Sequence, residues 1–251
     1  MKINIPRRLK AFSIHFSFSA AAFFVVLYFI LAHWYPKPHF TVNGGWQGVR
    51  IMLFVDFVLG PFLTLLLFRP LKSFRALAFD MTCIVIMQIS AFTWGVYAVH
   101  SQRPVGLSLS DGTIYPILED ELRAQEKSPE DLKTLDEGRP PVMFSRAAET
   151  EEEQVGVVSY EFVEGIPKVA LVFLLDPIKN HINELFAASL DNIQDVPENF
   201  IPIRDAYLAR HKYQTGELAF VPFAGRYGNT LLVFNHSGKI IDSIPDPRYN
   251  N

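Results

Sequence analysis

The sequence predicts a membrane α-helical bundle of three transmembrane helices, followed by an α+β domain that ends in an antiparallel meander. Three apolar stretches, near 11–33, 49–68 and 77–99, each reach the roughly 20 residues that a helix needs to cross hydrocarbon. Charge divides the chain in the same way: residues 1–100 hold nine Lys/Arg and two acids, whereas residues 101–251 hold fourteen Lys/Arg and twenty-four acids. The second half is also patterned like a water-soluble domain. We therefore expect a membrane domain over 1–100 and a second domain over 101–251.

The first apolar stretch reads as an uncleaved anchor. Apolar sequence continues for ten residues beyond the small-residue run Ser19–Ala22, whereas a cleaved signal peptide has a shorter apolar region. The N-terminus and the loop between the second and third stretches hold seven Lys/Arg, against three in the first loop and around the outer helix ends. By the positive-inside rule, the N-terminus is expected to be cytoplasmic and residues 101–251 to lie across the membrane.

The second apolar stretch carries the most unusual residues of the chain. It contains Asp56, then the pair Gly60-Pro61, then Thr64. A charge in hydrocarbon costs about 2.5–3.5 kcal/mol on insertion scales, so such a residue usually pairs inside the protein or marks a function. Proline removes a backbone hydrogen bond and crowds the preceding turn, so Gly60-Pro61 is expected to kink the helix.

Two interpretations of these residues stay open. Asp56 either has a structural role, paired inside the bundle or wetted from the exported side, which we weigh as the more usual case, or contacts a partner helix. The glycine and proline form either a packing kink or a groove for the apolar helix of another protein. Thr64 and Gln88 are placed to satisfy freed polar groups near mid-membrane. The candidate contacts with a partner helix are Asp56, Gly60, Pro61, Thr64 and Gln88.

The second half predicts several helices. Ser128 followed by Pro129 and two acids is a typical helix start, with a capping serine and proline in the first turn. Apolar residues over 178–190 recur at helical spacing, and a further helix is expected near 203–208. Residues 138–153, which contain two prolines and a run of glutamates, are expected to form an exposed loop.

Strands are predicted where Val, Leu and Phe gather. Two are expected at 155–162 and 169–175, and the closing meander is expected from three apolar runs separated by turn-rich segments. Those three runs are 218–223, 230–234 and 240–244. Arg226 and Tyr227, in the first of these turns, are candidate contacts of the exported domain with a partner, or else they support the hairpin.

The residues offer nothing that reads as catalysis. A single cysteine, Cys83, excludes an intramolecular disulfide and a cysteine-based zinc site. The seven histidines show no metal-binding spacing, and neither a nucleophile elbow nor a phosphate loop is present. The acidic second half also lacks the basic patch that nucleic acid requires. We expect no catalytic residue, no metal, no cofactor and no nucleic-acid partner.

Short motifs, dense over residues 8–105, point together to one family. They are Trp34-Tyr35-Pro36, Asp56-x-Val-Leu-Gly-Pro-x-Leu-Thr64, Phe79-Asp80, Gln88, Trp94-Gly95 and Arg103-Pro104, with Phe220–Tyr227 near the end of the chain. On these residues the chain resembles the TfpX/TfpZ type IV pilin accessory proteins, also described as fimbrial assembly proteins.

The resemblance implies an inner-membrane protein of a Gram-negative bacterium with a periplasmic second domain. It implies an accessory or chaperone-like factor that works beside a cognate major pilin and supports its assembly into surface pili. Other inner-membrane components of the type IV pilus, and membrane lipid, would be further partners. The alternative is a membrane-tethered periplasmic sensor or a subunit of a transport complex, whose exported domain binds a small ligand or another envelope protein.

Overall fold

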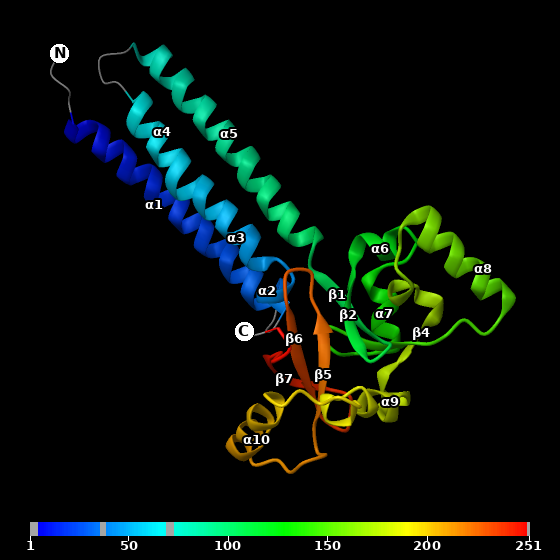
Figure 1. The fold of residues 1–251 in the computed structure, drawn as a ribbon. Coiled ribbons are helices and arrows are strands. Elements are labelled where there is room, and N and C mark those ends of the chain that lie inside the picture. The colour runs from blue at the N-terminus through cyan, green and yellow to red at the C-terminus, as the bar shows by residue number, and fades with distance from the viewer. Residues whose placement is uncertain (1–4, 36–38, 69–72, 250–251) are drawn as a thin grey trace. The chain divides into compact units, whose positions relative to one another are not determined.

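The computed structural model describes residues 5–35, 39–68 and 73–249. The chain divides into two compact units (Figure 1), which we call the helical unit (Met1–Pro36 with Gly44–Ser101) and the sheet unit (Lys37–Asn43 with Gln102–Asn251). Some residues used above, in the basic clusters and in one motif, lie outside the described residues. They are Lys2, Pro36, Lys37, Arg69 and Lys72.

Three long helices, which run side by side in Figure 1, make up the helical unit. Their spans Arg7–Trp34, Gly45–Leu67 and Phe74–Ser101 are long and apolar enough to cross a membrane, which agrees with the three predicted stretches. The first consists of α1 (Ile5–Phe29) and a π-helical turn, η1 (Ile30–Trp34); the second of α3 (Gly45–Leu53), a π-helical turn η2 (Phe54–Leu59) and α4 (Gly60–Leu67); the third is α5 (Phe74–Ser101).

The middle helix adapts to Gly60-Pro61 by widening. Immediately before the pair, η2 replaces α-helical turns, and the Gly60 N–H donates to the Val55 carbonyl five residues back. Pro61 then falls in the first turn of α4, where its missing N–H matters least. Such π-helical turns often lie at functional sites, and this one carries Asp56.

A seven-stranded mixed sheet forms the centre of the second unit, in the order β4-β3-β1-β2-β5-β6-β7. Neighbouring strands are antiparallel except for the parallel pairs β1–β3 and β2–β5. The predicted closing meander is confirmed as β5–β6–β7. The strands are β1 (Pro104–Ser110), β2 (Thr113–Leu118), β3 (Val142–Ser145), β4 (Leu175–Pro177), β5 (Ala219–Ala224), β6 (Asn229–Phe234) and β7 (Ile240–Pro245).

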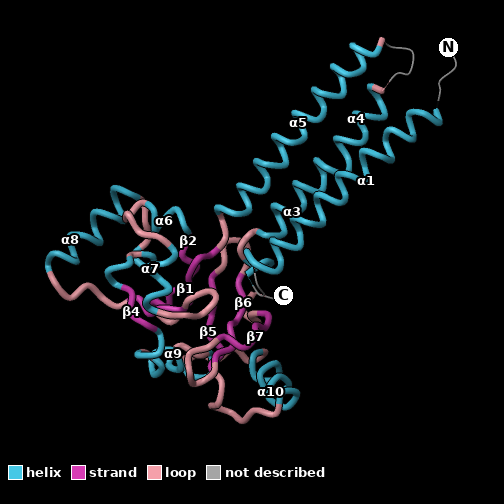
Figure 2. The backbone as a smooth tube through the Cα atoms, turned by 180° about the vertical axis from the view of Figure 1, so that it is seen from behind, coloured by secondary structure: helices cyan, strands magenta, loops and turns pink. Residues whose placement is uncertain are grey.

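Helices cover both faces of this sheet (Figure 2). Along β5, Val221 and Phe223 join the hydrophobic cluster of one face, which includes Leu185 of α9, whereas Phe220 points to the other face and packs with Phe200 of α10. Two of these helices fulfil sequence predictions: α7 begins directly after Ser128, and α10 covers 203–208. The helices are α6 (Glu119–Arg123), α7 (Pro129–Leu135), α8 (Glu151–Ser159), α9 (Ile182–Ala187) and α10 (Phe200–His211).

The short helix α2 (His39–Val42) lies between the first two long helices in sequence but belongs to the sheet unit. Val42 is 8% exposed and joins the same hydrophobic cluster as Leu107 and Phe223. The sequence-based division had assigned this loop to residues 1–100. No periodic pattern marks this attachment, because it consists of one buried valine and of the hydrogen bonds that Val42 and Asn43 accept from the turn between β5 and β6.

Residues 155–162 are not a strand, contrary to the sequence prediction. They lie in α8 and a π-helical turn, η3 (Tyr160–Glu164). The physical reason is a capping box at the helix start: the Glu153 N–H donates to Thr150 Oγ1 at 3.1 Å, and the Glu153 carboxylate accepts from backbone N–H groups. The cap fixes a helical start that outweighs the β-propensity of the valines that follow.

Three other predictions for this unit were wrong in part. Residues 169–175 form 3₁₀ turns, η4 (Lys168–Ala170) and η5 (Val172–Leu174), and only Leu175 begins β4. The predicted loop 138–153 contains β3 and the start of α8. The predicted helix 178–190 is reduced to α9, between the 3₁₀ turns η6 (Ile178–Asn180) and η7 (Leu190–Asn192).

Candidate functional site

Four of the five predicted helix-contact residues come together in the helical unit. Asp56, Gly60 and Thr64 follow one another at intervals of four on the middle helix, so they share a face. All three are buried, and Gln88 of α5 reaches them from the neighbouring helix. Pro61 is also buried, directly after Gly60.

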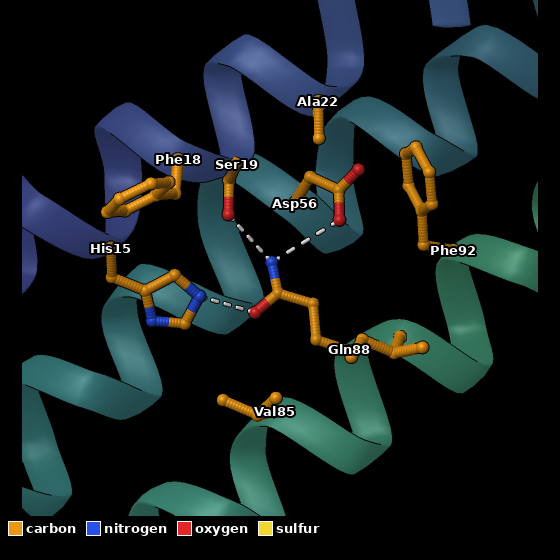
Figure 3. Close-up of a pocket in the computed structure, with 9 residues that line it drawn as sticks. His15, Phe18, Ser19, Ala22, Asp56, Val85, Gln88 and Phe92 are labelled. Atoms are coloured by element: carbon orange, nitrogen blue, oxygen red, sulfur yellow. Dashed lines mark hydrogen bonds between the residues drawn. The ribbon is translucent and has the colours of Figure 1, made fainter.

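The Gln88 side chain is the centre of this polar cluster (Figure 3). Its amide nitrogen donates to Ser19 Oγ at 2.9 Å and to Asp56 Oδ1 at 3.3 Å, which uses both amide hydrogens. Its carbonyl oxygen lies 2.6 Å from His15 Nε2, so that ring nitrogen acts as the donor. One glutamine therefore connects α1, the middle helix and α5.

His15 and Thr64 extend the cluster. His15 Nδ1 lies 2.6 Å from Thr64 Oγ1, and the Thr64 hydroxyl donates to the Gly60 carbonyl at 3.1 Å. The His15 ring therefore connects Thr64 of the middle helix to Gln88 of α5. The Gly60 carbonyl is not the one that Pro61 frees, which belongs to residue 57, and a hydroxyl bond to the carbonyl four residues back is common for a helical threonine. The predicted role of Thr64 in satisfying a freed polar group therefore stays a prediction.

Gly60 is required by the position of Gln88. A Cβ at residue 60 would lie 2.2 Å from Gln88 Oε1 and 2.6 Å from Nε2, far inside contact distance. The absence of a side chain there lets the amide lie against the middle helix. A polar side chain of α5 therefore approaches the middle helix closely at Gly60.

Sequence reasoning did not include His15 and Ser19 among the site residues. Both lie on α1, four residues apart, and so on one helical face. Two polar residues at that spacing in an apolar helix indicate a shared polar face, but Ser13 and Ser17 have the same spacing and are exposed, so the signal alone does not select His15 and Ser19.

A cavity of about 430 Å³ opens beside the cluster. It lies between α1 and α5, with Asp56 of the middle helix at its floor, and Figure 3 shows the residues that line it. Thr64 is not among them. The lining consists of His15, Phe18, Ser19, Ala22, Asp56, Val85, Gln88, Ile89 and Phe92.

Asp56 has a hydrogen-bond acceptor that no described residue uses. Its side chain is 3% exposed, and Oδ1 accepts the hydrogen bond from Gln88. Oδ2 is buried and has no hydrogen-bond partner among the described residues. In Figure 3 this oxygen points away from Gln88. An acceptor left in that state is costly when it is shielded from water.

In the sheet unit, Arg226 and Tyr227 lie in the turn between β5 and β6. The Tyr227 N–H donates to the Val42 carbonyl at 2.8 Å, and the Arg226 N–H donates to Asn43 Oδ1 at 3.4 Å. The Arg226 guanidinium pairs with Gln102 and lies 5.8 Å from the centre of the Tyr227 ring, which is exposed. Their backbone thus holds the α2 loop, and the aromatic ring remains accessible.

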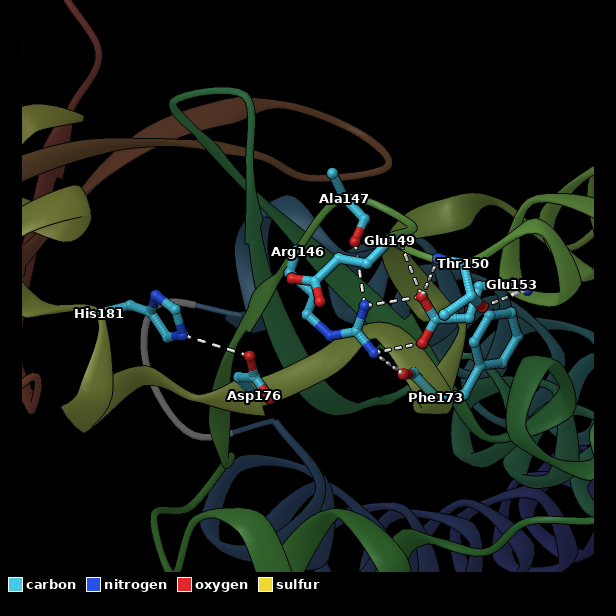
Figure 4. Close-up of polar contacts among 8 residues, drawn as sticks. All are labelled: Arg146, Ala147, Glu149, Thr150, Glu153, Phe173, Asp176 and His181. Carbon is cyan, nitrogen blue, oxygen red and sulfur yellow. Dashed lines mark hydrogen bonds and ion pairs between the residues drawn. The ribbon is translucent and has the colours of Figure 1, made fainter.

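A second polar cluster fixes the start of α8 (Figure 4). Arg146 Nη1 and Nη2 contact the two oxygens of Glu153 at 3.0 and 2.5 Å. This pairing, together with the backbone N–H of Glu149, lowers the pKa of the Glu153 carboxyl to about 2. Nearby, His181 contacts Asp176 and stacks on Phe144. Across the described ranges, no group of three or more His, Cys, Asp or Glu side chains is placed to hold a metal ion.

Comparison with curated proteins relates the chain to pilus biogenesis. It is 33% identical over 100 residues to a fimbrial assembly protein of serogroups C1 and C2 from Dichelobacter nodosus, a match that covers 39% of this chain and 75% of that protein. The chain belongs to the family of fimbrial assembly proteins. Relatives from serogroups I and E1 of the same organism match at 33% and 31% identity.

The shared region of this fimbrial assembly family member is limited. The chain spans 38% of the length of the serogroup I and E1 relatives, over 100 and 98 residues. No protein-family profile matches the chain. No solved structure matches it either.

Proposed function

We propose that this chain is an inner-membrane accessory factor of the TfpX/TfpZ type that supports the assembly of a cognate type IV pilin into surface pili. The relatives named fimbrial assembly proteins support a role in this process at a coarse level. The finer assignment is supported by the motifs around Asp56–Thr64 and Trp94-Gly95. In this proposal the protein acts by binding, in a chaperone-like way, and not by catalysis.

The proposed location is the bacterial inner membrane. The three long helices cross it, the N-terminus is cytoplasmic, and the bulk of the sheet unit is periplasmic. The excess of Lys and Arg at the N-terminus and between the second and third helices supports this orientation. The strongly negative charge of residues 101–251 suits a domain in water, although acids contribute little to orientation.

The observation that carries the proposal is the cavity between α1 and α5, with a polar floor and apolar walls. Inside a membrane, an apolar helix gains little by leaving lipid for an apolar surface, so recognition there depends on close packing and interhelical hydrogen bonds. A groove that combines phenylalanine walls with the Asp56–Gln88–Ser19 cluster offers both. We propose that it holds the apolar helix of the pilin.

The sheet unit is proposed to contact the globular part of the same pilin. The exposed ring of Tyr227, with Arg226 beside it, is the candidate contact of this unit. Aromatic and arginine side chains contribute disproportionately to protein interfaces, which supports this choice.

Deletion of the gene tests the proposed function. We expect surface piliation to fall while the amount of pilin in the membrane is unchanged, and a plasmid copy to restore it. Pili would be counted by electron microscopy and pilin measured by immunoblot. Normal piliation in the deletion strain would contradict the proposal, whereas loss of the pilin itself would indicate a role in its stability.

A further inference from the structure

The groove between α1 and α5 is shaped for a helix. Its wall residues on α1 are 15, 18, 19 and 22, and those on α5 are 85, 88, 89 and 92. Both sets have the spacing i, i+3, i+4, i+7, so each helix presents one continuous face to the same space. Phe18 and Ile89 in these walls are 75% and 61% exposed. Each wall is thus one helical face, the kind of surface against which another helix packs.

No described side chain of the walls donates to the buried Asp56 Oδ2. The amide hydrogens of Gln88 are already donated to Ser19 and to Oδ1 of Asp56. His15 contacts Thr64 and Gln88, and Ser19 Oγ makes its hydrogen bond with Gln88. The remaining wall residues are apolar: Phe18, Ala22, Val85, Ile89 and Phe92.

We propose that the occupant of this groove is a transmembrane helix that carries a hydrogen-bond donor on its apolar face, which pairs with Oδ2 of Asp56. The inference rests on the proposed function and adds the chemistry by which the partner is recognised. The occupant is a helix because backbone polar groups in hydrocarbon must be satisfied within their own segment. The apolar walls require a largely apolar surface around the donor, which is a hydroxyl, an amide or an amine.

The donor supplies selectivity. A helix without it would leave Oδ2 unpaired in a site now closed to water, whereas a helix that carries it at the right turn completes the cluster. Discrimination by an otherwise unpaired polar group is stronger than discrimination by apolar shape alone. The groove therefore favours one class of apolar helix over the many others in the same membrane.

The test uses the full-length protein in its native membrane with the strain's own major pilin. A photo-reactive phenylalanine analogue replaces Phe18 or Ile89, and the cross-linked pilin is measured. We expect cross-linking in the parent and a loss of about tenfold in Asp56→Leu, since a buried hydrogen bond is worth about that factor. Asp56→Asn, which keeps an acceptor, is expected to lose less.

Tyr35→Phe is the matched control. It removes another buried hydrogen bond of the helical unit, from Tyr35 Oη to the Val99 carbonyl at 2.9 Å, and Tyr35 does not line the cavity. Cross-linking is expected to persist in this variant. An equal loss in Tyr35→Phe and Asp56→Leu would show that Asp56 acts only through the stability of the bundle, and would overturn the inference.

The source of the donor is identified by replacing each polar residue of the pilin's apolar helix with alanine. One replacement should lower cross-linking in the parent but cause no further loss in Asp56→Leu, as expected for two groups that pair. Unchanged cross-linking in Asp56→Leu would overturn the donor inference while the proposed function stands. Absence of pilin cross-linking in the parent would instead count against the proposed function.

Discussion

At the scale of single residues, Gly60 determines whether the polar cluster can form. Gly60→Ala would place a Cβ 2.2 Å from Gln88 Oε1, so Gln88 must leave its bonds to His15 and Asp56. We expect destabilisation of about 1–3 kcal/mol, the usual cost of overpacking a filled site. Thermal unfolding of the detergent-solubilised protein, followed by circular dichroism, measures it.

Gly95→Ala is the control for this substitution. Its Cβ would meet Met52 Cγ at 2.8 Å, so Met52 must shift, but this neighbour is apolar and takes no part in the Gln88 cluster. Alanine also favours a helix over glycine by about 1 kcal/mol. Gly95→Ala is therefore expected to destabilise the protein less than Gly60→Ala. If both variants unfold at the same temperature, the Gln88 cluster contributes nothing to stability.

Glu153 gives the sheet unit a specific dependence on pH. Its pKa is lowered to about 2 in the folded chain, from an ordinary value of 4.5. A depressed folded pKa contributes stability that is present above 4.5 and is lost as pH falls through 4.5 toward 2. The free energies of unfolding of wild type and Glu153→Gln should differ most at neutral pH. This difference should shrink as pH falls from 4.5 toward 2.

Denaturant unfolding at a series of pH values measures this difference. Glu152→Gln serves as the control, since Glu152 is exposed and adjacent. It is expected to follow the wild-type curve at every pH. If the free energies of unfolding of wild type and Glu153→Gln differed by the same amount at every pH, the charge of the carboxylate would not be the source of the stabilisation by Arg146 and the backbone N–H groups.

At the scale of elements, the α2 loop depends on the turn between β5 and β6. A Cβ at Gly225 would lie 2.6 Å from the Val42 carbonyl and 2.7 Å from the Gly228 carbonyl. Both neighbours are backbone oxygens, which cannot rotate out of the way as the end of a side chain can. Gly225→Ala is therefore expected to release the loop 39–43 from the sheet unit and to break the Tyr227–Val42 hydrogen bond.

Hydrogen exchange at residues 39–43 measures this release. Gly228→Ala is the matched variant in the same turn, because its Cβ meets only Val42 Cγ1 at 3.8 Å, an ordinary contact. Exchange in the loop should rise in Gly225→Ala and stay at the wild-type level in Gly228→Ala. A loop protected equally in both variants would mean that Val42 alone holds it.

The elements also show which parts of the fold are readable from sequence. The meander β5–β6–β7 was predicted because its strands are apolar runs divided by turn residues. The hairpin β1–β2 was missed, although Asp111-Gly112, with φ of 48° and 74°, is a strong two-residue turn signal. For α8, the Thr150–Glu153 cap was visible in sequence, yet the valines after it favoured a strand.

The candidate site was predictable only in part, for a related reason. Polar residues inside an apolar stretch are conspicuous, so Asp56, Thr64 and Gln88 could be selected from sequence. Their mutual geometry could not, because it depends on how the helices are rotated against each other. The four-residue spacing of His15 and Ser19 indicates a shared face, but only the packed bundle places that face against Gln88.

At the scale of the whole molecule, the opposite charges of the two halves predict a topology. Lys and Arg gather at the N-terminus and between the second and third helices, and acids dominate residues 101–251. Insertion with the positive loops in the cytoplasm is favoured. Ser73, just before α5, should then be cytoplasmic, and Ser159, at the end of α8, should be periplasmic.

The single cysteine makes this topology directly measurable. In a Cys83→Ala background, Ser73→Cys and Ser159→Cys each introduce one thiol by a nearly isosteric change at an exposed residue. A membrane-impermeant maleimide applied to intact spheroplasts should label Ser159→Cys at once and Ser73→Cys only after detergent opens the membrane. The reverse pattern would invert the orientation and place the sheet unit away from any exported pilin domain. Immediate labelling of both would mean that the second and third helices do not cross the membrane as a pair, because Ser73 lies between them.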